Sequence, residues 1–202
     1  LYTVNVMISW LFYVEYATLN SQKPYNPALD ANGFKQGGLG TGVSELGTWG
    51  DFNGYQPFIP CGISDILGNG SGVVTYNIWK WCDGLNITED GTTRQAFVTT
   101  NPDFINDDNV NSYENRGIMS HSEGWITAMI LGTYADLIPS SVGGSSSTYF
   151  ADYYWLSTDS GLWGALLGGA AYGGSAGGLA CVNSGGRFAG AGSDVGSRLC
   201  FV

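Results

Sequence analysis

Positive charge is scarce in this sequence. Seven Lys and Arg residues stand against 17 Asp and Glu residues, which gives a formal net charge of −10. A field of this sign repels phosphate backbones and anionic lipid headgroups. We therefore expect no nucleic-acid partner.

Cysteine and histidine are also few, and their spacing forms no metal or redox motif. No CxxC pair occurs, so neither a zinc site nor a thioredoxin-like motif is indicated. The only histidine, His121, is close to Glu123, but an isolated histidine in a Ser-Gly context is more often structural than catalytic. We interpret the four cysteines as buried thiols, with one disulfide, or two in one of three pairings, as the alternative: Cys61, Cys82, Cys181 and Cys200.

No apolar run is long enough to span a bilayer comfortably, so membrane insertion is not expected. Residues 4–17 are apolar, but Asn5, Ser9 and Glu15 interrupt them, and no Lys or Arg precedes them as in a signal peptide. Apolar residues recur three and four apart here, which predicts a helix over residues 9–20 packed on a sheet. The chain begins at Leu1 without methionine, which suggests the C-terminal part of a longer protein or a processed product.

Glycine and aromatic residues, by contrast, are abundant. The 202 residues include 32 Gly, 7 Trp and 12 Tyr, and 44% are hydrophobic, which excludes global disorder and is not typical of a helical bundle. The length fits a single domain over residues 1–202. The expected fold class is α+β, loop-rich, with short strands and one or two helices. Strands or short buried elements are predicted at 58–60, 73–76, 78–81, 125–131, 149–156, 162–167, 179–182 and 198–202, and an exposed acidic loop at 101–115.

Some local patterns match functional motifs without the context that those motifs need. Residues 173–177 match the G-x-S-x-G nucleophile elbow, but His121 lies upstream and no helical pattern follows, so a hydrolase is not expected. Asp103, Asp107 and Asp108 could offer oxygen ligands to calcium, yet their spacing is not that of an EF-hand. We expect no cofactor, with calcium as the unsupported alternative. Asn86 begins an N-glycosylation sequon, which means little without a secretory signal.

Several segments together resemble structural and adhesion proteins of gut-bacteroidete phages. The matching pieces are residues 15–22, 36–43, 68–69, 78–86 (with Ile78-Trp79-Lys80-Trp81-Cys82-Asp83-Gly84), 139–149 and 168–199. Their order and spacing resemble the C-type-lectin-like fold of formylglycine-generating-enzyme relatives and of variable proteins of diversity-generating retroelements. The enzymatic relatives carry a close cysteine pair near the C-terminus, whereas Cys181 and Cys200 are far apart, so the resemblance does not extend to oxidase chemistry. A Glu-Pro-Asn sugar motif is also missing.

The resemblance implies a C-type-lectin-like domain whose last part, residues 161–202, displays variable side chains to a host receptor. The partner would be a protein or glycan on a bacterial surface, and the protein would lie on a virion, or on a bacterial cell if prophage-encoded. Homo-oligomers or a larger virion assembly fit the same picture. The expected ligand contacts are Trp163, Tyr172, Ser175, Ala180, Val182, Ser184, Arg187 and Phe188. The alternative function is a virion decoration or fibre subunit that binds no receptor.

The residue types of the last segment are compatible with diversification. Residues 168–202 contain no Lys, Glu, Gln, Met or Trp, the five types among those present in the chain that a mutated AAY codon cannot reach. A segment rich in Gly and Ala also lacks these types by composition alone. The residue types fit both interpretations.

Overall fold

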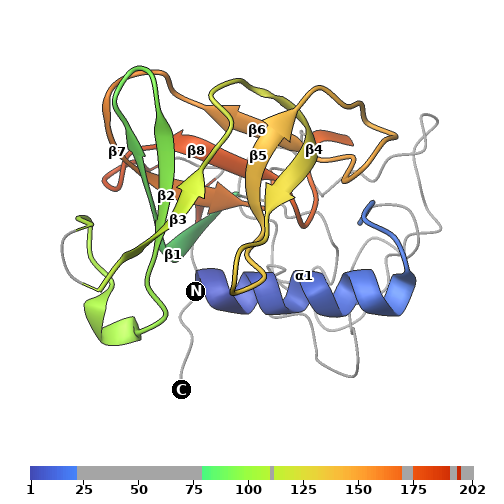
Figure 1. Ribbon diagram of the computed structural model, residues 1–202, viewed down its shortest axis with the longest axis horizontal. Helices are drawn as coiled ribbons and strands as arrows, with labels where there is room; N and C mark the ends of the chain where they lie inside the picture. The colour runs from blue at the N-terminus through green and yellow to red at the C-terminus, as the bar shows by residue number, and fades with distance from the viewer. Residues whose placement is uncertain (22–78, 110–111, 170–174, 192–194, 197–202) are drawn as a thin grey trace.

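The computed structural model describes residues 1–21, 79–109, 112–169, 175–191 and 195–196 (Figure 1). These residues form one α-helix, one short 3-10 helix and nine strands. Their bounds are α1 Tyr2–Tyr16, β1 Trp79–Glu89, β2 Arg94–Val98, η2 Pro102–Phe104, β3 Glu114–Ile118, β4 Gly124–Ile130, β5 Ile138–Val142, β6 Tyr153–Leu156, β7 Gly161–Leu167, β8 Val182–Gly186 and β9 Val195–Gly196.

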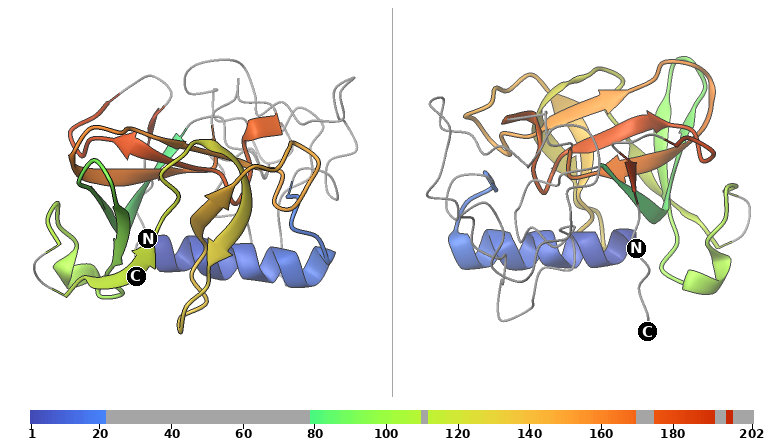
Figure 2. Two further views of the ribbon diagram at one scale, coloured as in Figure 1. Left: turned by 45° about the horizontal axis from the view of Figure 1, so that its top comes forward. Right: turned by 180° about the vertical axis from the view of Figure 1, so that it is seen from behind.

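The strands form one curved, nearly closed sheet. Its order is β3-β2-β1-β7-β8-β6-β4-β5, and β9 pairs with β1 beside this path. Most neighbours are antiparallel, while β6 with β8 and β1 with β9 are parallel. The two ends of the path, β3 and β5, approach each other. Just after β3, the Ser120 N–H donates a hydrogen bond to the carbonyl of Pro139 in β5 at 3.0 Å. Figure 2 shows the resulting barrel-like curvature from two further sides.

This architecture corrects the expected fold class. The described part of the chain is mostly β, with a single α-helix, and is not a loop-rich α+β C-type-lectin-like fold. The strands at 94–98, 114–118 and 138–142 were not predicted, and together they turn isolated hairpins into a nearly continuous sheet. The strand predictions at 58–60, 73–76 and 198–202 lie outside the described residues.

Helix α1 lies across one open end of the curved sheet (Figure 1). It begins and ends earlier than the predicted 9–20, and Ala17 ends it in the left-handed region at φ 50°. Its buried positions recur three or four apart and so lie along one face of the helix. Tyr2 accepts a hydrogen bond from the Leu137 N–H at 3.2 Å, and the Trp10 indole N–H donates to the Ala135 carbonyl at 2.7 Å. The helix is thereby attached to the segment that leads into β5.

The core lies between α1 and the inner face of the sheet. Burial of these apolar side chains is the main favourable contribution to folding. The largest fully buried apolar side chains are Tyr154, Phe12, Ile8, Ile87, Ile126, Ile138 and Val98. They come from the helix and from five strands, so the helix and sheet share one core cluster.

A bulge divides β1 into two halves. Cys82 is opposite Ala165 on β7 and Asn86 is opposite Gly164, so three residues of β1 are inserted where β7 advances by one position. Gly84, inside the bulge, has φ +88°, and a Cβ there would lie 3.0 Å from the Thr99 carbonyl. Only glycine adopts this backbone readily, so the bulge has a local sequence cause.

Candidate functional site

The structure describes seven of the eight predicted contact residues, and these are buried, half-buried or exposed. Trp163, Ala180, Val182 and Ser184 are buried. Ser175 is half-buried, and only Arg187 and Phe188 are exposed. Tyr172 lies outside the described residues. The expectation that this whole segment points outward is therefore wrong for four positions, and their side chains cannot contact a ligand in this conformation.

The position of β7 and β8 in the sheet explains this correction. Each has a strand on both sides, β7 between β1 and β8, and β8 between β7 and β6. In a strongly curved sheet every second side chain of such a strand points into the core. Ser184 illustrates the consequence, because its hydroxyl donates to the Tyr154 hydroxyl at 2.9 Å inside the protein. Ser184 is therefore a core residue and not part of a display surface.

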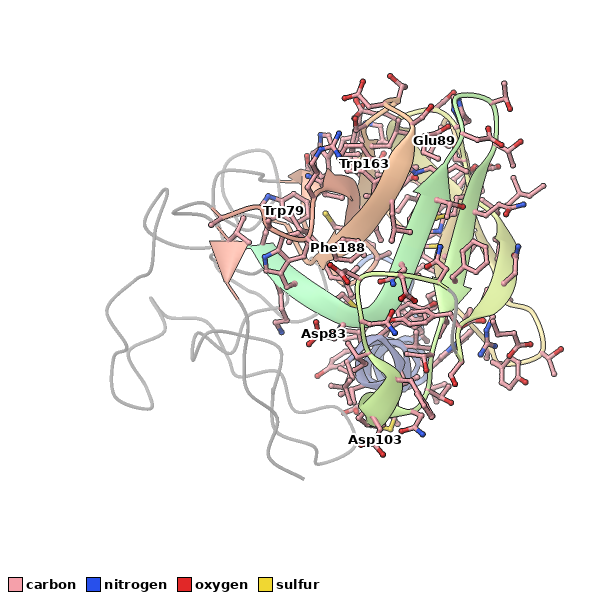
Figure 3. All side chains as sticks on the ribbon, turned by 90° about the vertical axis from the view of Figure 1, so that its left-hand side faces the viewer. Trp79, Asp83, Glu89, Asp103, Trp163 and Phe188 are labelled. Carbon is pink, nitrogen blue, oxygen red and sulfur yellow. The ribbon has the colours of Figure 1, made fainter. Side chains whose placement is uncertain are left out.

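An outward-facing pocket lies instead where the β1 bulge meets the turn after β8. Its cavity volume is about 120 Å³. Figure 3 shows Phe188 and Asp83 on this side of the molecule, beside β1. The lining combines two aromatic rings, two carboxylates and two amides with the backbone of β1 and β7: Trp81, Cys82, Asp83, Gly84, Asn86, Ile105, Asn106, Asp107, Gly164 and Phe188. We call it the bulge pocket.

Gly164 forms the floor of the bulge pocket. A Cβ at this position would lie 2.8 Å from Cζ3 of Trp81 and 3.3 Å from Cδ1 of Phe188. Both rings therefore rest on the bare backbone of β7. The two aromatic residues are remote in the sequence, and the pairing of β1 with β7 and of β7 with β8 brings them together.

The loop after β2 forms the other wall and is held by Asn86. The Asn86 amide donates to the carbonyls of Asn106 and Asp108, at 3.0 and 2.6 Å. The Tyr113 hydroxyl adds a bond of 3.1 Å to the Asn106 carbonyl. Asn86 is only 2% exposed, so its sequon is not accessible to a glycosyltransferase in the folded protein. The wall is thus fixed by partly buried hydrogen bonds, while Asp83 and Asp107 remain exposed at the rim.

Cys82 belongs to the pocket lining, but its side chain lies in the core cluster, where the Sγ accepts a hydrogen bond from the Asn5 amide at 3.7 Å. Burial raises the pKa of Cys82 to about 12, against smaller lowering effects that include a contact from the Asn5 amide. Because the thiolate is the nucleophile and the metal ligand, this thiol is inert near neutral pH. Cys82 and Cys181 are both buried and free, which confirms the thiol interpretation for these two. Cys61 and Cys200 lie outside the described residues.

A second polar cluster lies at the far end of β1. Fully buried Arg94 donates to Glu89 at 3.0 Å, to the Ser157 carbonyl at 2.7 Å and to the Ser184 carbonyl. His121 contacts the other Glu89 oxygen at 3.0 Å, whereas Glu123 accepts from the Leu156 N–H. Burial raises the pKa of Glu89, but hydrogen bonds from His121, the Gly91 N–H and Arg94 outweigh it, so this pKa lies below its usual value. The cluster joins β1 and β2 to β8 and the chain after β6.

Neither a metal site nor a membrane span is found in the part of the chain that the structure describes. No three His, Cys, Asp or Glu side chains there are grouped so that they could hold an ion. Asp103, Asp107 and Asp108 are exposed on the loop, as the acidic-loop interpretation expects. Within the same residues no helix has the length and apolar character needed to cross a membrane.

Comparisons with family models, curated proteins and solved structures give no match to this chain. The resemblance to phage variable proteins therefore stays a prediction. The site has to be judged on its own geometry. Trp81 and Asp83 were missed as site residues, and Asp107 was considered only as a calcium ligand. The one available signal was Gly84 inside an apolar run, which indicates a bulge or a close approach.

Proposed function

We propose that this protein is a binding protein of the adhesion or receptor-binding kind, and that the bulge pocket is its ligand site. The ligand would belong to a bacterial surface, as the sequence resemblance suggests, although the lectin-like scaffold is not part of the proposal. The observation that carries it is the meeting of Trp81, Phe188 and two rim carboxylates in one open cavity.

The chemistry of the lining favours binding. Ligand sites are concave, with aromatic walls and a few placed polar groups, and aromatic side chains gain contact area at low entropic cost. The bulge pocket has this composition, and its backbone wall is held rigidly by Asn86. The Cys82 thiol lies in the core and is protonated near neutral pH, so it is not an activated nucleophile. Phe188, one of the predicted ligand contacts, also lines this pocket.

The test is sedimentation of the purified protein with a panel of gut-bacteroidete cells. We expect Phe188→Ala to lower the bound fraction about tenfold, because a central aromatic contact is typically worth 1 to 2 kcal/mol or more. Tyr149→Ala is the matched control, since Tyr149 is an exposed aromatic residue outside the pocket. Equal adhesion of the two folded variants would contradict the proposal and favour a structural virion subunit.

A further inference from the structure

We infer that the bulge pocket takes a small organic cation, such as a methylated ammonium headgroup, and does not take a neutral sugar. This inference rests on the proposed function, because it names the ligand class of the same pocket. It follows from the charge, the aromatic walls and the size of the cavity.

The described lining of the pocket is negatively charged. Asp83 and Asp107 line it, and none of the ten described residues in its lining is Lys, Arg or His. Neither carboxylate forms an ion pair with a described residue. These carboxylates attract a cation and repel an anion, and the net charge of −10 on the chain acts in the same direction.

The walls suit a cation that carries methyl or methylene groups. The negative faces of aromatic rings attract ammonium and guanidinium groups, and tryptophan does so most strongly. The chain itself forms this contact next to the pocket, where the Arg187 guanidinium lies over the Trp163 ring at 4.5 Å from its centroid. Arg187 is thus held on Trp163, and Trp81 with Phe188 are the aromatic residues that line the cavity.

The size of the cavity limits what can enter. Sites for whole drug-sized ligands enclose about 300–1,000 Å³, whereas the bulge pocket encloses about 120 Å³. It has room for one headgroup or the end of one side chain. A complete glycan would have to remain largely outside, and a cationic substituent of a surface polymer or protein would enter.

The experiment is an NMR titration of the full chain with choline, with 3,3-dimethyl-1-butanol as its neutral isostere and methyl glucoside as the sugar. We expect choline to shift the signals of Phe188 and the β1 bulge, and to bind about tenfold more tightly than the isostere. Equal binding of choline and the isostere, tighter binding of the glucoside, or no shift with choline would each overturn the inference.

Matched variants locate the effect. Asp83→Asn removes one carboxylate from the rim, and we expect it to weaken choline binding several-fold. Asp103→Asn makes the same change of charge on the exposed loop outside the lining, and it should leave binding unchanged. Equal losses in both variants would overturn the inference, because the general field and not the pocket would then hold the cation.

The two proposals fail separately. If Phe188→Ala loses cell adhesion but choline does not bind, the ligand class is wrong and the binding function stands. If choline binds but Phe188→Ala adheres to cells as well as the parent does, the adhesion function is wrong and the cation site stands.

Discussion

At the scale of single residues, Arg94 is the most unusual feature of the described structure. A fully buried guanidinium has lost its hydration and needs partners in the protein. It finds Glu89 and the carbonyls of Ser157 and Ser184, which belong to three separate segments. Such a pair adds little to stability compared with apolar residues, but it becomes costly when one partner is removed. Arg94 therefore fixes which segments meet.

Arg94→Met should lower the free energy of unfolding by about 3–5 kcal/mol, because buried Glu89 would lose the charge that pairs with its Oε2 atom. Urea unfolding followed by tryptophan fluorescence measures the change. The control is Glu114→Gln, which breaks the 3.4 Å ion pair with Arg116 on a side chain that is 57% exposed. This variant should change stability by less than about 0.5 kcal/mol. Similar values for both variants would show that burial of the ion pair does not matter.

The same cluster predicts a dependence of stability on acid. The pKa of Glu89 is lower in the folded chain than its usual value. A depressed carboxyl pKa stabilises the fold above the unfolded pKa, and this stabilisation is lost as the pH falls through the folded pKa. Glu89→Gln should therefore lose less free energy of unfolding than the parent between pH 5 and strongly acidic pH, about 2. Parallel pH profiles of the two proteins, measured by urea unfolding, would contradict this prediction.

At the scale of elements, the sequence predicts strands well where most residues of the strand are apolar. The run at 162–167 agrees with β7 within one residue, and 125–131 overlaps β4. The strands β2, β3 and β5 escaped prediction because they contain Arg94, Glu114 and Pro139, residues that are not typical of strands. Arg94 is also bound by the carbonyls of Ser157 and Ser184, which are distant in the sequence, so local patterns could not predict its burial.

The bulge pocket shows the same limit at the candidate site. Aromatic residues near positions 81 and 188 are visible in the sequence, but their meeting over Gly164 follows from strand pairing. The prediction of Phe188 as a contact residue depended on a resemblance. Ala180 and Val182 were predicted on the same grounds, but they are buried. Whether a side chain of β7 or β8 is exposed or buried depends on the strands that flank it in the sheet. Residue type alone therefore does not distinguish the two cases.

Gly164→Ala tests the element that supports the pocket. The added methyl group would overlap Trp81, whose ring carbon lies 2.8 Å from the ideal Cβ, and would press on Phe188. We expect a loss of about 1–3 kcal/mol in the free energy of unfolding, as for other overpacked sites. The side-chain NMR signal of the Trp81 indole should shift as the ring moves. An unchanged indole signal and unchanged urea unfolding would show that the rings of Trp81 and Phe188 do not pack on Gly164 of β7.

At the scale of the whole molecule, the sheet and the helix depend on each other. The curved sheet has an open end, and α1 lies across it and contributes Ile8, Phe12 and Tyr13 to the common core. An isolated helix of 15 residues is marginal in water, so packing on the sheet stabilises it. The bulge pocket is built by β1, β7 and the turn after β8, and no residue of α1 lines it.

Phe12→Ala should therefore destabilise the whole fold, while native molecules should retain the pocket. The Phe12 side chain is fully buried, so its removal should cost about 3–5 kcal/mol. Val14→Ala is the control on the same helix, because Val14 is 76% exposed and its loss should change stability by less than about 0.5 kcal/mol. Urea unfolding measures both effects. A Phe12→Ala protein as stable as Val14→Ala would mean that the sheet closes without the helix, and that the shared core contributes nothing to stability.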